Sequence, residues 1–118
     1  PHLVFQSPIT LDEIEARFDL APVQPSEGLY IHFLRVWRSG AHLLFETHIK
    51  EPTIEQRLAL TLSARDDQRF TLQLSALGHP RPTEGVHEAV TLLGDWLLRM
   101  HPAARVVVRK LQSDDRDQ

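Results

Sequence analysis

Histidine is the first residue type to consider for chemistry, because the chain has seven histidines in 118 residues and no cysteine. A metal site needs donor atoms that converge within a few ångströms of one ion. His42 and His48 are roughly 20 Å apart on one expected strand, and His87 and His101 are about 21 Å apart on an expected helix. Glu46 and His48 lie roughly 7 Å apart and could share an ion. No third ligand can be identified, and we therefore expect no metal site.

His32 is expected on the core-facing side of a strand, which is an unusual place for an imidazole. Its simplest interpretation is a structural histidine that is hydrogen-bonded to a neighbour beneath the helices. The alternative is a general base, since histidine titrates near neutral pH. That base would belong to an enzyme or a small-ligand carrier, in a pocket between sheet and helices lined by His32, Tyr30 and Trp96. The sequence identifies neither an orienting carboxylate nor a substrate cleft.

No motif of an established catalytic chemistry stands out. The glycines, at positions 28, 40, 78, 85 and 94, are isolated rather than clustered as in phosphate-binding loops. A nucleophile elbow and a dinucleotide fingerprint are also missing. We therefore expect no cofactor, and the sequence does not favour an enzyme.

The strongest functional signal is one face of the first expected β-hairpin. The wet face of an antiparallel sheet should be polar, yet this face mixes large apolar residues with charged ones. Aromatic residues and arginine are enriched at protein interfaces, and burial would contribute roughly 1.5–3 kcal/mol for each large apolar side chain. The predicted binding surface consists of Ile31, Phe33, Arg35, Trp37, His42, Leu44, Glu46 and His48.

We predict that this surface mediates protein association, either as a homodimer or with another protein partner. Phe33, Trp37 and Leu44 would be the anchors. Arg35 and Glu46 would orient the partner from the rim. No role in catalysis is assigned to any of these residues.

Two alternatives account for the same residues differently. In single-stranded nucleic-acid binding, Phe33 and Trp37 would stack on bases while Arg35, Lys50 and Arg65 followed the backbone. The net charge of −3 does not favour that partner, since nucleic-acid binders usually cluster basic residues. In the other alternative, a segment of the same chain covers the apolar residues of this face. That segment would be the N-terminal one, around Leu3, Val4 and Phe5.

These positions follow from a hairpin with strands near Leu29–Arg38 and Ala41–Lys50 and a two-residue turn at Ser39-Gly40. The register pairs Trp37 with His42. A loop one residue longer that closes on a bulge would exchange the faces of one strand. The core face in the expected register comprises Tyr30, His32, Leu34, Val36, Leu43, Phe45, Thr47 and Ile49.

The helices are marked by local signals. Thr10 and Glu13 form a capping box before the first helix, which should end near Leu20. Residues 22–28, rich in proline and glycine, are expected to form a loop. Thr83 is the expected N-cap of a second, amphipathic helix that Pro102 closes.

The remaining segments are expected strands. A short strand is expected at His2–Gln6. A second hairpin turns at residues 66–68. Arg105–Leu111 is expected as a final strand, and its three consecutive valines indicate burial on both faces or a position beside a covered edge. This order predicts an α+β fold with an antiparallel four-strand meander plus a C-terminal strand, and two helices packed on one face.

Composition limits the class of protein. At 118 residues, with 42% apolar and 25% charged residues, the chain is typical of one globular domain. We assign this domain to residues 1–112 and expect a disordered charged tail at 113–118. The absence of cysteine excludes disulfides and thiolate metal sites. No apolar run is long enough for a membrane helix and no signal peptide is visible, so we expect a cytoplasmic protein without a membrane partner.

Overall fold

The alternating apolar residues of the sequence become the inner face of one antiparallel sheet. The computed structural model describes residues 1–111. Within these residues, seven strands are hydrogen-bonded in the order β2-β3-β4-β5-β6-β1-β7, and all neighbours are antiparallel. The strands are β1 (His2–Gln6), β2 (Val23–Ser26), β3 (Leu29–Ser39), β4 (His42–Lys50), β5 (Glu55–Ala64), β6 (Arg69–Leu74) and β7 (Arg105–Lys110).

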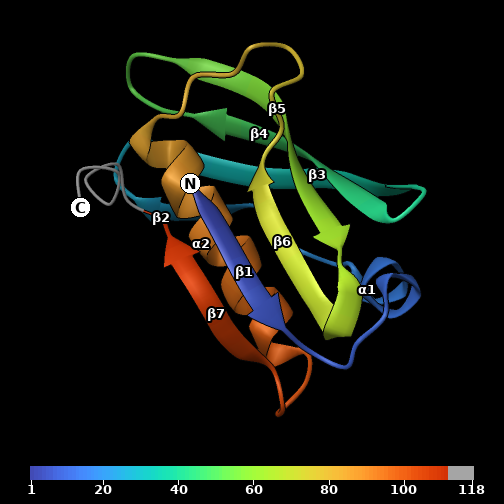
Figure 1. Ribbon diagram of the computed structural model, residues 1–118. Helices are drawn as coiled ribbons and strands as arrows, with labels where there is room; N and C mark the ends of the chain where they lie inside the picture. The colour runs from blue at the N-terminus through green and yellow to red at the C-terminus, as the bar shows by residue number, and fades with distance from the viewer. Residues whose placement is uncertain (112–118) are drawn as a thin grey trace.

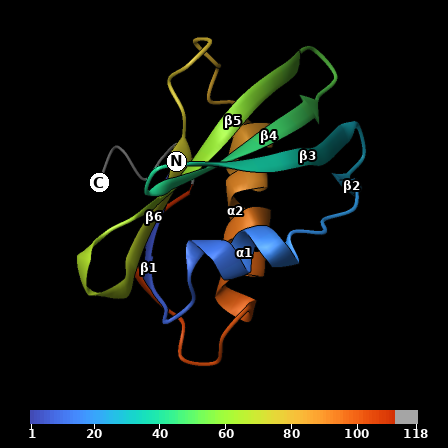
Figure 2. The ribbon, with the colours of Figure 1, turned by 90° about the vertical axis from the view of Figure 1, so that its right-hand side faces the viewer.

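The sheet is curled, and its concave side holds the helices. Helix α2 (Glu84–Arg99) lies within the curl, so that strands from both ends of the sheet surround it (Figure 1). Helix α1 (Leu11–Arg17) lies on the same side, below β3, β4 and β5 in Figure 2. The convex side, called the outer face from here on, is not covered by a helix in the part of the chain that the structure describes.

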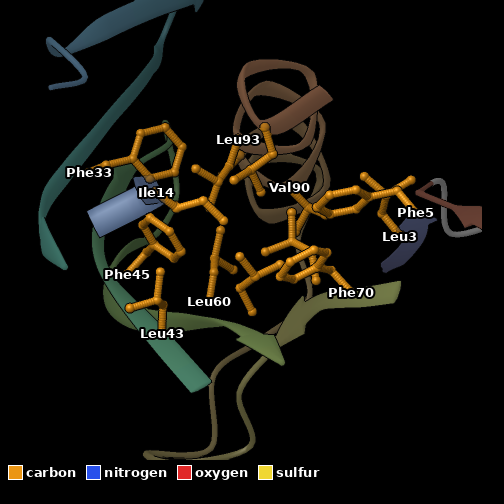
Figure 3. Close-up of a cluster of buried hydrophobic side chains, with 14 of the residues drawn as sticks. Leu3, Phe5, Ile14, Phe33, Leu43, Phe45, Leu60, Phe70, Val90 and Leu93 are labelled. Carbon is orange, nitrogen blue, oxygen red and sulfur yellow. The ribbon is translucent and has the colours of Figure 1, made fainter. Parts of the chain in front are cut away.

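The core fills the space between the curled sheet and the two helices. Figure 3 shows Phe33 and Phe45 beside Ile14 of α1, with Leu93 of α2 above them. At the other end of the core, Phe5 and Phe70 stack with ring centroids 5.2 Å apart. Side chains therefore occupy the region in which a pocket lined by His32, Tyr30 and Trp96 was expected. Further buried members of the core include Leu3, Leu43, Leu60, Leu72, Val90 and Leu97.

Both predicted helix starts are confirmed. The Thr10 hydroxyl accepts the Glu13 backbone N–H at 3.1 Å, and the Thr83 hydroxyl accepts that of Val86 at 3.4 Å. Helix α1 ends at Arg17, earlier than the predicted Leu20, because Phe18 takes an extended backbone conformation. This places the Phe18 ring 5.7 Å from the ring of Phe45, within the core.

The predicted α+β class and antiparallel sheet are confirmed, but the sheet is larger than predicted. The predicted loop at residues 22–28 contains β2, which pairs with β3 and extends the meander to five strands. The predicted four-strand meander plus one C-terminal strand is therefore replaced by a seven-stranded sheet within residues 1–111. The extra pairing forms because Gly28 adopts a φ of +80° and lets the chain reverse tightly into β3.

The final strand also differs from the prediction. All six residues of β7 are exposed, and the consecutive valines 106–108 have exposed fractions of 37–39%. The prediction of burial was wrong because β7 pairs only with β1 and forms an edge of the sheet. The predicted tail, 113–118, lies outside the described residues. No helix within residues 1–111 is long and apolar enough to cross a membrane.

Candidate functional site

The hairpin that carries the predicted site turns at Gly40-Ala41 rather than at Ser39-Gly40. Ser39 pairs with His42, and Gly40 has a φ of +60°, as glycine does at the first central position of a type II′ turn. The shift moves the partner of Trp37 from the predicted His42 to Leu44.

A β-bulge between Phe33 and Arg35 then reverses the two faces of the N-terminal half of β3. The bulge inserts one unpaired residue, and the alternation of side chains is inverted on its N-terminal side. Ile31 and Phe33 are consequently buried, with exposed fractions of 0% and 4%, and Figure 3 shows Phe33 inside the core. Their predicted place on the outer face was wrong. Tyr30 and His32, predicted to face the core, lie on the outer face instead.

Trp37 and Leu44 form the centre of the remaining apolar surface. They are cross-strand partners, and Trp37 has an exposed fraction of 38%. The Arg35 guanidinium lies 5.0 Å from the Trp37 ring centroid and 3.1 Å from the Glu46 carboxylate. Arg35, Trp37, Leu44 and Glu46 are called the Trp37 patch below. Because Arg35 touches both the ring and the carboxylate, the patch is a preformed surface.

The opposite side of the hairpin tip is attached to α1. Arg38 forms an ion pair with Asp12 and also donates to the Gly40 carbonyl at 2.8 Å. Since side chains alternate along a strand, this contact directs Arg38 towards α1 and Trp37 away from it. The suggested intrachain cover, Leu3 to Phe5, lies instead in β1, between β6 and β7.

The two predicted histidines of the site lie at different places on the outer face. His42 is at the hairpin tip, where Nδ1 lies 2.8 Å from the Ser63 hydroxyl. His48 lies further along β4, where Nε2 is 2.6 Å from Glu55 Oε2. His48 thus belongs to a second polar cluster rather than to the Trp37 patch. Within residues 1–111 no three His, Asp or Glu side chains are close enough to hold a metal ion.

The second cluster lines a groove where the β2–β3 and β4–β5 turns meet. The Tyr30 ring packs edge-on against His48 and His32, with centroid distances of 5.7 and 6.3 Å. The groove has a volume of about 660 Å³, within the range of small-ligand sites. The lining of this Tyr30 groove comprises Gln24, Gly28, Leu29, Tyr30, His48, Lys50, Glu51, Pro52 and Glu55.

Both acidic residues of the groove are held by other groups. The hydrogen bond from His48 lowers the pKa of Glu55 from its usual 4.5, and the positive charges of His48, Lys50 and Arg57 act in the same direction, against desolvation. The carboxylate of Glu51 accepts the Thr83 hydroxyl at 2.5 Å and the Gly85 backbone N–H at 3.0 Å. It therefore caps the N-terminus of α2, where a negative charge is favoured.

Sequence reasoning did not identify the Tyr30 groove. Its members come from two turns and four strands. Because the bulge in β3 was not predicted, Tyr30 was assigned to the wrong face of the sheet. One signal was present: Pro52 marks a turn that makes Lys50 and Glu55 cross-strand partners. Trp96 is not part of the groove and packs against Phe18, with ring centroids 6.3 Å apart.

Comparisons with known proteins add no family to this geometry. No family model, curated protein or solved structure matches the chain. A function must therefore be argued from the Trp37 patch and the Tyr30 groove themselves.

Proposed function

We propose that this protein self-associates through the outer face of the β3–β4 hairpin, with the Trp37 patch at the centre of the interface. One observation carries the proposal. Trp37 is 38% exposed and cross-strand from Leu44, on a sheet face without a helix over it in the described part of the chain. Tryptophan and arginine are the residue types that most often dominate binding energy. Here both are already positioned before association.

The charges of the patch favour a second copy as the partner. Arg35 and Glu46 form the neighbouring cross-strand pair on one side of Trp37 and Leu44, so the patch contains one basic and one acidic group. In a two-fold symmetric interface each contact occurs twice. If residue i of one copy contacts residue j of the other, then residue j of the first copy also contacts residue i of the second. Arg35 of each copy can then face Glu46 of the other while the two apolar centres meet. A patch with a single sign of charge would repel its own copy.

The register of β3 and β4 weakens the case for single-stranded nucleic-acid binding. Phe33 was one of two proposed base-stacking residues, and it is buried. The remaining aromatic, Trp37, has Arg35 against its ring and the Glu46 carboxylate close by. A carboxylate at that place disfavours an approaching phosphate.

The test is the dependence of molar mass on concentration, measured by sedimentation velocity. The wild-type protein should form dimers, and Trp37→Ala should weaken dimerisation roughly 30-fold, the effect of removing a hot-spot residue. Leu77→Ala is the matched control, because Leu77 is 73% exposed and lies outside the patch. A monomeric wild type, or a dimer that is equally strong in Trp37→Ala, contradicts the proposal.

A charge exchange tests the two-fold arrangement separately. Arg35→Glu alone should weaken association, because two acidic groups then meet across the axis. The double variant Arg35→Glu with Glu46→Arg should restore it, since opposite charges again face each other. Loss of association in the double variant would show that the two residues do not meet across the interface.

A further inference from the structure

We propose that the Tyr30 groove is a second, independent site that binds a small organic carboxylate with an apolar body. The groove lies at the opposite end of the hairpin from the Trp37 patch. Tyr30 and Trp37 are seven residues apart on β3, a separation of roughly 23 Å. The proposal therefore does not depend on self-association.

The apolar part of such a ligand would lie against a rigid wall. Leu29, Tyr30 and Pro52 line the groove. The two turns that carry them pack closely, because a Cβ atom on Gly28 would lie only 3.0 Å from Pro52 Cγ. Gly28 also needs its φ of +80° to make the turn. The groove is thus largely preformed, as small-molecule sites usually are.

The hydrogen bonds that the charged groups already make favour an anion over a cation, although the lining holds two carboxylates and one lysine. Glu51 is hydrogen-bonded to the N-terminus of α2, and Glu55 is hydrogen-bonded to His48. Each carboxylate therefore already has partners. Lys50 also lines the groove, and its positive charge lowers the pKa of Glu55. Among the described residues, 1–111, the ion pair of Glu55 is with His48 and not with Lys50. The Lys50 ammonium is the group best placed to receive a ligand carboxylate.

Arg57 adds a positive charge beside the groove lining. Arg57 pairs with His48 across β4 and β5, and Lys50 pairs with Glu55. Glu55 is accordingly surrounded by His48, Lys50 and Arg57, all of which lower its pKa. A carboxylate with an aromatic or aliphatic body would place its charge at Lys50 and its body against Tyr30, the cross-strand partner of Lys50. Neutral ligands of the same shape would lack the charged contact.

Benzoate is a suitable probe, with benzamide as a neutral molecule of the same shape. Tyr30 is the single tyrosine of the chain, so its ring resonances in NMR spectra can be assigned without ambiguity. Titration with benzoate at constant ionic strength should shift the Tyr30 and His48 signals in a saturable way at millimolar concentration, as expected for so small a ligand. Benzamide should bind roughly tenfold more weakly, because a charge-assisted hydrogen bond is lost.

Variants of Lys50 test the charged contact directly. Lys50→Ala should weaken benzoate binding roughly tenfold, whereas Lys50→Arg should retain most of it. Lys110→Ala removes a lysine from β7 and should have no effect. Trp37→Ala should also leave benzoate binding unchanged, which separates this site from the association surface. Equal binding of benzoate and benzamide, or equal binding by wild type and Lys50→Ala, would overturn the proposal.

Discussion

At the scale of single residues, Glu55 connects the Tyr30 groove to the stability of the fold. Its carboxylate lies 2.6 Å from His48 Nε2, and this hydrogen bond lowers the pKa of Glu55 below 4.5. A carboxyl group with a lowered pKa in the folded state stabilises that state when it is ionised. The contribution is fully present above the unfolded-state pKa and is lost as the pH falls through the folded-state pKa.

Glu55→Gln should remove this pH dependence. At about pH 5.5 the variant should be slightly less stable than the wild type, and the difference should disappear in the acid range where Glu55 becomes protonated. The effect should be small, because the contact is solvent-exposed and screened. Urea unfolding of both proteins at several pH values measures it. A difference that grows as the pH falls would mean that the ionised carboxylate does not stabilise the fold.

At the scale of elements, the start of α2 is joined to the end of β4 by unusually close packing. A Cβ atom on Gly85 would lie 2.7 Å from Glu51 Cδ and 2.8 Å from Ile49 Cγ2. Two hydrogen bonds hold Glu51 in place, and Ile49 is a stiff, β-branched residue within the core. Glycine is therefore required at position 85, so that the helix can approach the capping carboxylate.

Gly85→Ala should destabilise the protein by about 1–3 kcal/mol, the usual cost of overpacking, which outweighs the gain in helix propensity. Gly94→Ala is the matched comparison within the same helix. Its Cβ would have one very close neighbour, the terminal Cδ2 methyl of Leu3 at 2.7 Å, where Gly85 has both Glu51 and Ile49, and the substitution should therefore cost less. Thermal unfolding of the two variants compares them. If the two substitutions are equally tolerated, the β4–α2 contact is not tightly packed.

At the scale of the whole molecule, the two terminal strands of the sheet carry features that disfavour association through their edges. Strand β2 is four residues long and contains Pro25, which cannot donate a backbone hydrogen bond. Strand β7 offers three half-exposed valines but also Arg105, Arg109 and Lys110. Pairing β7 with its own copy would bring these basic residues close together. Charged and proline-containing edges are a common protection against edge pairing.

Replacing these three basic residues of β7 by threonine should remove that protection. The triple variant should associate more strongly than the wild type, through pairing of β7 edges. This additional association should persist when Trp37→Ala is added, because it does not use the Trp37 patch. Sedimentation velocity on the combined variant tests the expectation. Unchanged association of the triple variant would show that charge does not protect this edge.

Much of the fold could be predicted from patterns among residues that are a few positions apart in the sequence. Thr10 and Thr83 were recognised as helix caps because a hydroxyl and the N–H that it caps are three residues apart. The turn at residues 66–68 was likewise predicted, and Asp67 and Gln68 have positive φ there. Trp37 and Leu44 were placed on the outer face, because alternation holds between the bulge and the turn.

What the sequence alone determined was therefore the type and order of most elements, since helix caps, turns and alternation depend on near neighbours. The tertiary structure decided where Ile31, Phe33 and Tyr30 point, because the bulge in β3 inverts one half of that strand. It also brought Tyr30, His48 and Glu55 together from three strands. No short-range pattern contains that information, since a bulge and its register depend on how the whole sheet curls around α2.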